Sequence, residues 1–131
     1  WNEWGLGSIL KLAYDNGTLL SGVSAGAICW FEQGVTDSWA GCLKPLSCLG
    51  FVSGSCCPHF DEEKERRPAL HALIKDKSFK TSFAIDGGSA LHFVNGQVRQ
   101  SVAFMQKKGS YIVGLENNSV VERKITGITI Y

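Results

Sequence analysis

Residues 16–31 carry no charged side chain, and this stretch constrains the fold more than any other feature of the sequence. Only six charged residues lie in residues 1–60, although the whole chain has 13 lysines and arginines and 12 aspartates and glutamates. A half with so few charges is expected to be largely buried. Because helices cover both faces of a parallel sheet, its strands read as continuous apolar runs. The first half of the chain therefore predicts buried strands covered by helices.

Length and composition narrow the class of protein further. The chain has 131 residues, which is enough for one domain with a core of its own. Its net charge of +1 argues against a nucleic-acid partner, which would favour a basic surplus. Its 44% hydrophobic and 19% charged residues exclude a disordered chain, and no apolar run approaches the roughly 20 residues of a membrane span. We therefore expect a soluble globular domain with neither a nucleic-acid nor a membrane partner.

The five cysteines predict a reducing compartment. Their number is odd and no two are spaced as C-x-x-C, so neither a disulfide scaffold nor a zinc site is expected. Reduced cysteines are typical of a cytoplasmic protein. A thiol of the segment Cys56-Cys57-Pro58 is an alternative nucleophile, although nothing in the sequence favours it over the serine described below.

Hydrophobic periodicity and turn residues predict the order helix, strand, helix, helix and then strands. The expected helices span residues 6–14, 25–31 and 61–75, with Gly34 closing the second of them. Residues 35–58 are expected to be irregular. The expected strands span residues 18–23, 83–85, 90–94, 97–104, 111–115, 119–123 and 125–130, with a hairpin turn at Asn95-Gly96. This order predicts an α/β domain with antiparallel strands at its C-terminal end.

The segment Gly22-Val23-Ser24-Ala25-Gly26 matches the pattern G-x-S-x-G. In this pattern a sharp turn between a strand and a helix exposes the serine hydroxyl, and the flanking glycines avoid side-chain clashes with the strained turn. The helix expected from Ala25 would aim its first amides at the same place, so the Ala25 N–H could support an oxyanion. The segment therefore predicts that Ser24 is a nucleophile, and the alternative is a tight structural turn.

A serine nucleophile needs a base, and the chain has three histidines. His92 lies in an expected strand and His71 lies within an expected helix, where both are more typical of packing or surface positions. His59 follows Pro58 in an irregular segment at the start of the third expected helix, and catalytic side chains concentrate on such loops. The sequence therefore favours His59 as the base.

The third group of such a site is a carboxylate that orients the imidazole. Asp37 is isolated from basic residues in a charge-poor region, so it is expected to have a buried partner. Asp86 is the competing candidate, although Asp86-Gly87-Gly88 is also ordinary turn chemistry. The charged run at 61–67 is expected to be a solvated helix face with i,i+4 pairs, and the alternative is that Arg66 or Arg67 binds a substrate carboxylate.

Several motifs resemble peptidase E (aspartyl dipeptidase) and its relatives, including cyanophycinase. The resemblance covers nearly the whole chain, in matching order, and is greatest to peptidase E-like proteins of Gram-positive bacteria. The motifs that carry it are residues 22–31 (GVSAGAICWF), 35–38 (VTDS), 57–61 (CPHFD), 65–68 (ERRP) and 86–93 (DGGSALHF).

This resemblance implies a class I glutamine amidotransferase-like (flavodoxin-like) three-layer sandwich. By position, it implies that Ser24 is the nucleophile, His59 the general base and Asp37 the residue that orients His59. Known members remove an N-terminal aspartate from dipeptides or cut aspartate-containing polymers, so the expected substrate is a short, Asp-containing peptide. The resemblance implies no metal and no organic cofactor.

The sequence departs from the family pattern in two places. Relatives often have an acidic residue directly after the aspartate equivalent to Asp86, and here that residue is Gly87. The upstream half of the family fold is also absent, and Met105 is the only methionine, so residues 1–131 are expected to form the C-terminal part of one domain.

The second departure has consequences for partners and activity. We expect either that the missing half is present as a companion chain, or that the chain is nearly inactive because it has only half an oxyanion hole. We also expect an open sheet edge, at which copies of the chain could form a homo-oligomer. The alternatives are a non-catalytic relative that binds a small acidic ligand or a protein partner, and an amidase or transferase with the same three residues.

Overall fold

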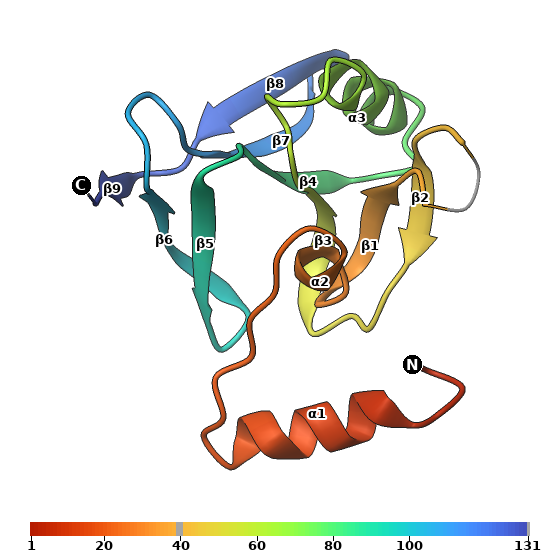
Figure 1. Cartoon of the computed structure of the whole chain (residues 1–131). Coiled ribbons are helices and arrows are strands. Elements are labelled where there is room, and N and C mark those ends of the chain that lie inside the picture. The colour runs from red at the N-terminus through yellow and green to blue at the C-terminus, as the bar shows by residue number, and fades with distance from the viewer. Residues whose placement is uncertain (39–40, 131) are drawn as a thin grey trace.

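A computed structural model describes residues 1–38 and 41–130 (Figure 1). The helices are α1 (Leu6–Asp15), α2 (Ala25–Ile28) and α3 (Arg66–Lys75). The strands are β1 (Phe31–Thr36), β2 (Lys44–Ser47), β3 (Val52–Cys57), β4 (Thr81–Ile85), β5 (Ser89–Val94), β6 (Gln97–Ala103), β7 (Ser110–Glu116), β8 (Ser119–Lys124) and β9 (Gly127–Thr129). The predicted α/β class is confirmed.

The main sheet has six strands in the order β2-β1-β3-β4-β7-β8. Its centre is parallel, because β1 pairs with β3 and β3 pairs with β4 in the same direction. Its two margins are antiparallel, with β2 against β1 and with β7 and β8 following β4. The parallel strands deliver their C-terminal ends, and the residues that follow them, to one edge of the sheet.

The two faces of this sheet bury different side chains. One face packs against α3, where Leu70 and Ile74 join Phe60 and Phe79 in a core that includes Val35, Cys57, Ala84 and Val113. The opposite face packs against α2 and β5, where Ile28 meets Phe31, Val52 and Cys56. Adjacent strand residues point to opposite faces, which places Cys56 in one core and Cys57 in the other. Burial of each large apolar side chain stabilises the fold by roughly 1.5–3 kcal/mol.

A second sheet, in the order β5-β6-β9, stands beside the first (Figure 1). The predicted hairpin turn joins β5 to β6, and Asn95 (φ 52°) and Gly96 (φ 75°) both have the positive φ that a two-residue hairpin of this kind requires. The ring of Phe93 lies edge-on to Phe31 and Phe83, with centroid distances of 5.6 and 5.3 Å. This aromatic cluster fixes β5 against the main sheet.

The prediction of an irregular segment over residues 35–58 is wrong, as is the extension of the second helix to residue 31. The structure has β1, β2 and β3 in this region. A Cβ atom at Gly34 would lie 2.5 Å from Cβ of Ile28, so the glycine allows α2 to pack on β1 rather than closing a helix. Pro45 lies in β2 at the edge of the sheet, where a missing N–H is tolerated.

Two other boundaries differ from the sequence prediction. Residues 18–23 form no strand, and they pair with none of the described strands. The third helix begins at Arg66 rather than at residue 61. Pro68 therefore lies in the first turn of α3, where a proline has no intrahelical N–H bond to break. The remaining predicted elements are confirmed within a few residues.

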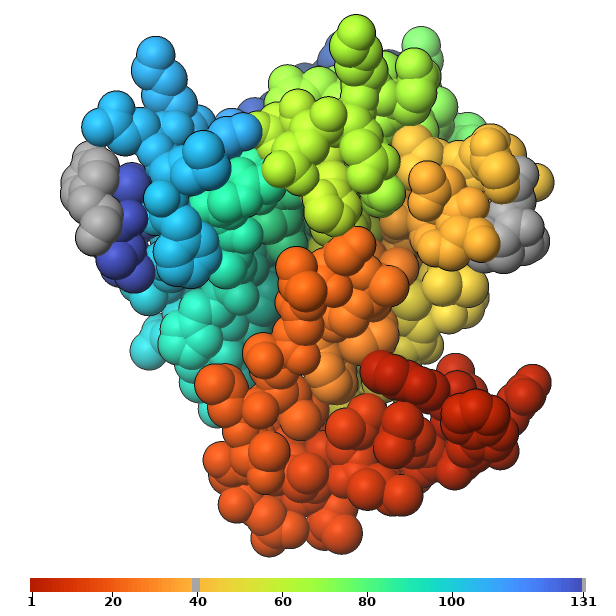
Figure 2. All heavy atoms as spheres, viewed as in Figure 1, coloured from red at the N-terminus to blue at the C-terminus, as the bar shows by residue number. Residues whose placement is uncertain are grey.

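The predicted burial of the charge-poor half holds only from Ile28 onward. Residues 1–27 include no buried side chain, and Trp4, Leu19 and Val23 are among the most exposed large apolar residues. Space-filling atoms show α1 as a ridge at the margin of the molecule (Figure 2). Across the described ranges, no helix combines the length and the apolar character that crossing a membrane requires.

Candidate active site

Ser24 occupies a strained turn between an extended segment and α2. Its backbone angles, φ 54° and ψ −118°, are rarely adopted by a residue with a side chain. The turn is held by hydrogen bonds from the Gly26 N–H to the Val23 carbonyl (2.9 Å) and from the Ala27 N–H to the Ser24 carbonyl (2.9 Å). The geometry is that of a nucleophile turn, in which the serine side chain projects away from its own backbone.

Gly22 makes this turn sterically feasible. A Cβ atom at position 22 would lie 2.0 Å from the carbonyl oxygen of Gly26, which is far inside any tolerable contact. A Cβ atom at Gly26 would meet nothing within 4 Å. The sequence pattern predicts that both glycines relieve a clash, and the structure assigns that role to Gly22 alone.

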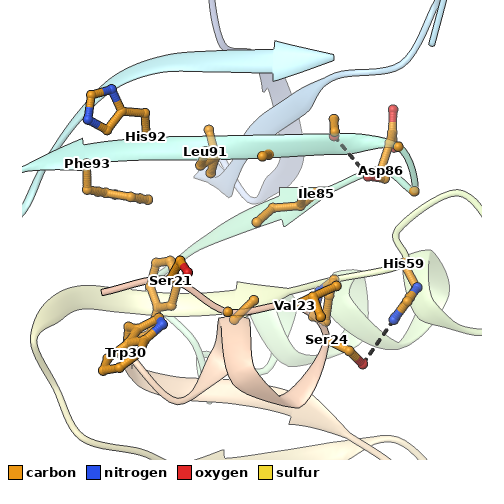
Figure 3. Close-up of a pocket in the computed structure, with 18 of the residues that line it drawn as sticks. Ser21, Val23, Ser24, Trp30, His59, Ile85, Asp86, Leu91, His92 and Phe93 are labelled. Carbon is orange, nitrogen blue, oxygen red and sulfur yellow. Dashed lines mark hydrogen bonds between the residues drawn. The ribbon is translucent and has the colours of Figure 1, made fainter. Parts of the chain in front are cut away.

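His59 lies directly beside Ser24, as Figure 3 shows. The Nε2 atom of His59 is 3.0 Å from the Ser24 Oγ atom. His59 follows the C-terminal end of β3 and Pro58, and it has a left-handed backbone with φ 55°. The next residue is fixed by a hydrogen bond from the Phe60 N–H to the Ile85 carbonyl (3.0 Å), so the imidazole projects from a well-anchored loop.

Glu62 occupies the far side of the imidazole. Its Oε2 atom is 2.7 Å from His59 Nδ1, and the Glu62 N–H also donates to the His59 carbonyl (3.2 Å) across one turn of the chain. Because an ionised carboxylate can only accept, a neutral His59 in this arrangement carries its proton on Nδ1, and its Nε2 atom can accept from the Ser24 hydroxyl. Ser24, His59 and Glu62 are thus joined by two hydrogen bonds in the order that a nucleophile, a base and an orienting acid require.

The sequence does not single out Glu62, because its place in the charged run 61–67 predicts a solvated helix face with an i,i+4 pair to Arg66. In the structure Glu62 precedes α3, and Arg66 pairs instead with Glu63, with 2.6 Å between Nε and Oε2. The signal that could have identified it is the separation of three residues from His59, which places both side chains on one side of a single turn.

Asp37, the predicted orienting acid, is not placed beside His59. Its side chain is 56% exposed and lies 3.9 Å from the Arg66 guanidinium. Arg66 itself is buried and donates to the Val35 carbonyl (3.2 Å) as well as to Glu63. As a correction to the sequence prediction, Asp37 therefore borders a buried arginine at the end of β1, while the His59 Nδ1 atom contacts Glu62.

Asp86, the competing candidate, is also directed elsewhere. Its Oδ2 atom accepts from the Gly109 N–H (3.1 Å) and lies 3.5 Å from the Tyr111 hydroxyl. Burial raises the pKa of the Asp86 carboxyl, and the neighbouring Asp61 raises it further. The carboxyl group thus ties the turn after β4 to the start of β7 and serves the framework of the site.

Asp61 fastens the loop that carries His59 to the turn at residues 86–88. It accepts a hydrogen bond from the Gly87 N–H (2.8 Å) and pairs with Lys108. Burial opposes ionisation of Asp61, but the hydrogen bonds from Lys108 and from the Gly87 amide lower its pKa below the ordinary value. This arrangement holds position 87 close to the His59 loop.

The other candidate nucleophile and bases are occupied or distant. Burial raises the pKa of the Cys57 thiol to about 12, so a thiolate is strongly disfavoured there. The Nε2 atom of His71 bonds to Glu122 (2.6 Å) on β8. His92 is exposed on β5, and its ring points away from Ser24 in Figure 3. All five cysteines are free thiols.

The Ser24–His59 pair opens into a cleft of about 500 Å³ between the segment 19–24 and β5. This volume lies within the range of small-ligand sites. Apolar side chains such as Leu20, Phe31, Leu91 and Phe93 form much of its wall. Among the described residues, no lysine or arginine lines this cleft.

The two arginines that the sequence offered as substrate-binding groups are engaged in the framework. Arg67 stacks over the Phe60 ring at 4.4 Å from the ring centroid and pairs with Glu122 at 3.3 Å. Arg66 fills a buried position between Val35 and Glu63.

We expect Arg66→Met to destabilise the fold. The substitution removes the donor to the buried Val35 carbonyl, which costs about 1–3 kcal/mol in the free energy of unfolding. Urea denaturation measures this loss, and Lys64→Met at an exposed position nearby is the control. An unfolding free energy equal to that of the control would mean that the contact from Arg66 to the Val35 carbonyl does not stabilise the fold.

Comparisons with known proteins identify the family of the chain. Residues 1–101 match peptidase family S51. The chain is also similar to the uncharacterized peptidase YgaJ of Bacillus subtilis (strain 168), with 51% identity over 122 residues. The alignment covers 93% of this chain and 53% of the relative, so the chain spans about half the length of the curated relative that it matches. The resemblance to the peptidase E group is thereby confirmed. The Ser24–His59 pair lies inside the matched region. The chain belongs to peptidase family S51.

Proposed function

We propose that this chain carries the reaction centre of a serine peptidase that hydrolyses short peptides. The observation that supports this most directly is the 3.0 Å contact between Ser24 Oγ and His59 Nε2 at a strained turn that borders a cleft. Membership of a peptidase family gives the reaction class, hydrolysis of a peptide bond. The contact supports a serine nucleophile, because a serine hydroxyl becomes nucleophilic when an adjacent base accepts its proton.

In the proposed reaction, Ser24 Oγ attacks the scissile carbonyl carbon while His59 Nε2 accepts the hydroxyl proton. The Ala25 N–H, adjacent to the nucleophile, is proposed to stabilise the negative charge that develops on the carbonyl oxygen. His59 then donates the proton to the departing amine, which leaves an acyl ester on Ser24. A water molecule deprotonated by His59 hydrolyses this ester and restores the hydroxyl.

The proposed substrates are short peptides that contain aspartate, and this preference rests on the family resemblance. The cleft volume suits a substrate of a few residues rather than a folded protein. Because Arg66 and Arg67 are bound to other groups, an aspartate side chain would have to be recognised by groups other than these two arginines. We further propose an amidotransferase-like fold, supported by the parallel arrangement of β1, β3 and β4 with α2 and α3 packed on opposite faces.

A fluorophosphonate probe tests the proposal without knowledge of the natural substrate. The activated serine oxygen displaces fluoride from phosphorus, which leaves a stable phosphonyl ester that peptide mass spectrometry can locate. We expect one adduct per chain, on Ser24, and competition of labelling by Asp-led dipeptides in the full-length protein. Absence of an adduct at Ser24 under conditions that label a known serine peptidase would contradict the proposed function and favour a non-catalytic binding role.

A further inference from the structure

We propose that Glu62 is the positioning residue for His59. We further propose that the Glu62 carboxylate occupies the space that a side chain at position 87 would fill, so that an aspartate at position 87 could take over the role of Glu62. This inference rests on the proposed function for its kinetic consequence, but its structural content stands on three observations. These are the contact between Glu62 and His59, the overlap between the Glu62 carboxyl group and a side chain at residue 87, and the hydrogen bond that holds residue 87 close to the loop of His59.

The first observation is the hydrogen-bonded chain itself. Glu62 Oε2 lies 2.7 Å from His59 Nδ1, on the side of the ring opposite Ser24. His59 has a left-handed backbone on a loop, so its ring orientation is not fixed by a regular helix or strand. A carboxylate on Nδ1 selects the tautomer whose Nε2 atom can accept from the serine.

The second observation concerns Gly87. A Cβ atom at this position would lie 2.0 Å from Cδ and from Oε1 of Glu62, and 2.6 Å from Oε2. The side chain of residue 87 would therefore begin where the Glu62 carboxyl group now lies. Gly87 is not among the residues with positive φ, so an aspartate could adopt its backbone conformation without that penalty. A side chain at residue 87 therefore fits only if the Glu62 carboxyl group, the far end of a half-exposed and flexible side chain, moves away.

The third observation is that position 87 is held in place independently of Glu62. The Gly87 N–H donates to Asp61 Oδ1 (2.8 Å), and Asp61 is in turn paired with Lys108. The preceding Asp86 is anchored through its carboxyl group to the Gly109 N–H. A carboxylate introduced at 87 would therefore begin beside the Glu62 carboxyl group on a fixed backbone, whereas the Asp86 carboxyl group is held through Oδ2 by the Gly109 N–H.

The inference predicts that the carboxylate can be moved between the two positions. We expect Glu62→Gly to reduce kcat about 100-fold with KM within threefold, which is less than the loss at a fully buried acid because Glu62 is half exposed. We expect Gly87→Asp alone to reduce activity, because two carboxyl groups then compete for the space beside His59. The double variant Glu62→Gly/Gly87→Asp should recover at least tenfold in kcat over Glu62→Gly.

A second readout makes the inference independent of catalysis. The proton on His59 Nδ1, when bound to a carboxylate, gives a low-field NMR signal that exchanges slowly with water. We expect this signal in the full-length parent protein, its loss in Glu62→Gly and its return in the double variant. Glu65→Gln, which removes an exposed carboxylate from the same segment, should leave both the signal and kcat unchanged.

The outcomes separate the two proposals. If Glu62→Gly keeps the signal, or if the double variant restores neither the signal nor kcat while its thermal unfolding matches that of the parent, the inference is wrong. If the signal follows the carboxylate but the parent protein shows no Ser24 adduct, the positioning of His59 stands and the proposed peptidase function fails.

Discussion

Ser24→Ala should lower kcat/KM for dipeptide hydrolysis by at least about 10⁴-fold in the full-length protein. The substitution removes the oxygen atom that we propose as the nucleophile, while the imidazole, the adjacent amide and the cleft remain. Serine and alanine differ by one oxygen atom, so the fold should be unchanged. Initial rates with Asp-led dipeptides, together with circular dichroism, measure the two effects separately.

The matched control is Ser8→Ala, at an exposed position of α1, which should leave hydrolysis unchanged. Residual hydrolysis within tenfold of the parent in Ser24→Ala would mean that another group attacks the substrate. Cys57 would be a poor explanation for such a result, because its thiol is buried within the α3-facing core and its pKa is raised to about 12.

Gly22→Ala should abolish most activity although residue 22 contributes no reacting group. Its new Cβ atom would lie 2.0 Å from the Gly26 carbonyl oxygen, and both groups belong to the backbone turn, so the turn itself must move. A displacement of about 1 Å at a reacting group costs about 10²-fold in rate, and loss of the contact to His59 should bring the total to on the order of 10³-fold. Fluorophosphonate labelling kinetics report this directly.

Gly26→Ala is the matched control for this prediction. The same methyl group at position 26 would meet nothing within 4 Å, and alanine is the better helix former by about 1 kcal/mol. We therefore expect unchanged labelling and a slight gain in thermal stability. Equal losses in the two variants would mean that the motif is sensitive to any added side chain, and the steric account of Gly22 would be incorrect.

The elements with a strong local signal could be predicted from the sequence, and those defined by tertiary contacts could not. Helix α1 and the hairpin of β5 and β6 follow from periodicity and from the Asn95-Gly96 turn. Strands β1 to β3 were missed because Gly34 and Pro45 are read locally as breakers. Their presence depends on Ile28 filling the space above Gly34 and on the edge position of Pro45, and neither is visible before the sheet is assembled.

The candidate site shows the same division. The positions of Ser24 and His59 could be predicted because each is marked by its own neighbours, the G-x-S-x-G pattern and the Pro58 turn. The acid could not, because Glu62 belongs to a run of acidic residues with several plausible basic partners. Its contact with His59 depends on where α3 begins and on free space at Gly87, which lies 25 residues further along the chain.

Ser24 and His59 both have a positive φ, which positions their side chains for the proposed reaction but lowers the stability of the fold. Conformations of this kind cost about 1–3 kcal/mol each, which is a considerable part of the 5–15 kcal/mol that stabilises a typical domain. Selection for stability alone would favour glycine or asparagine at these two positions, because both tolerate a positive φ. Such replacements would remove the hydroxyl of Ser24 and the imidazole of His59. A lineage released from catalysis should therefore lose this pair early and become harder to unfold as it does so.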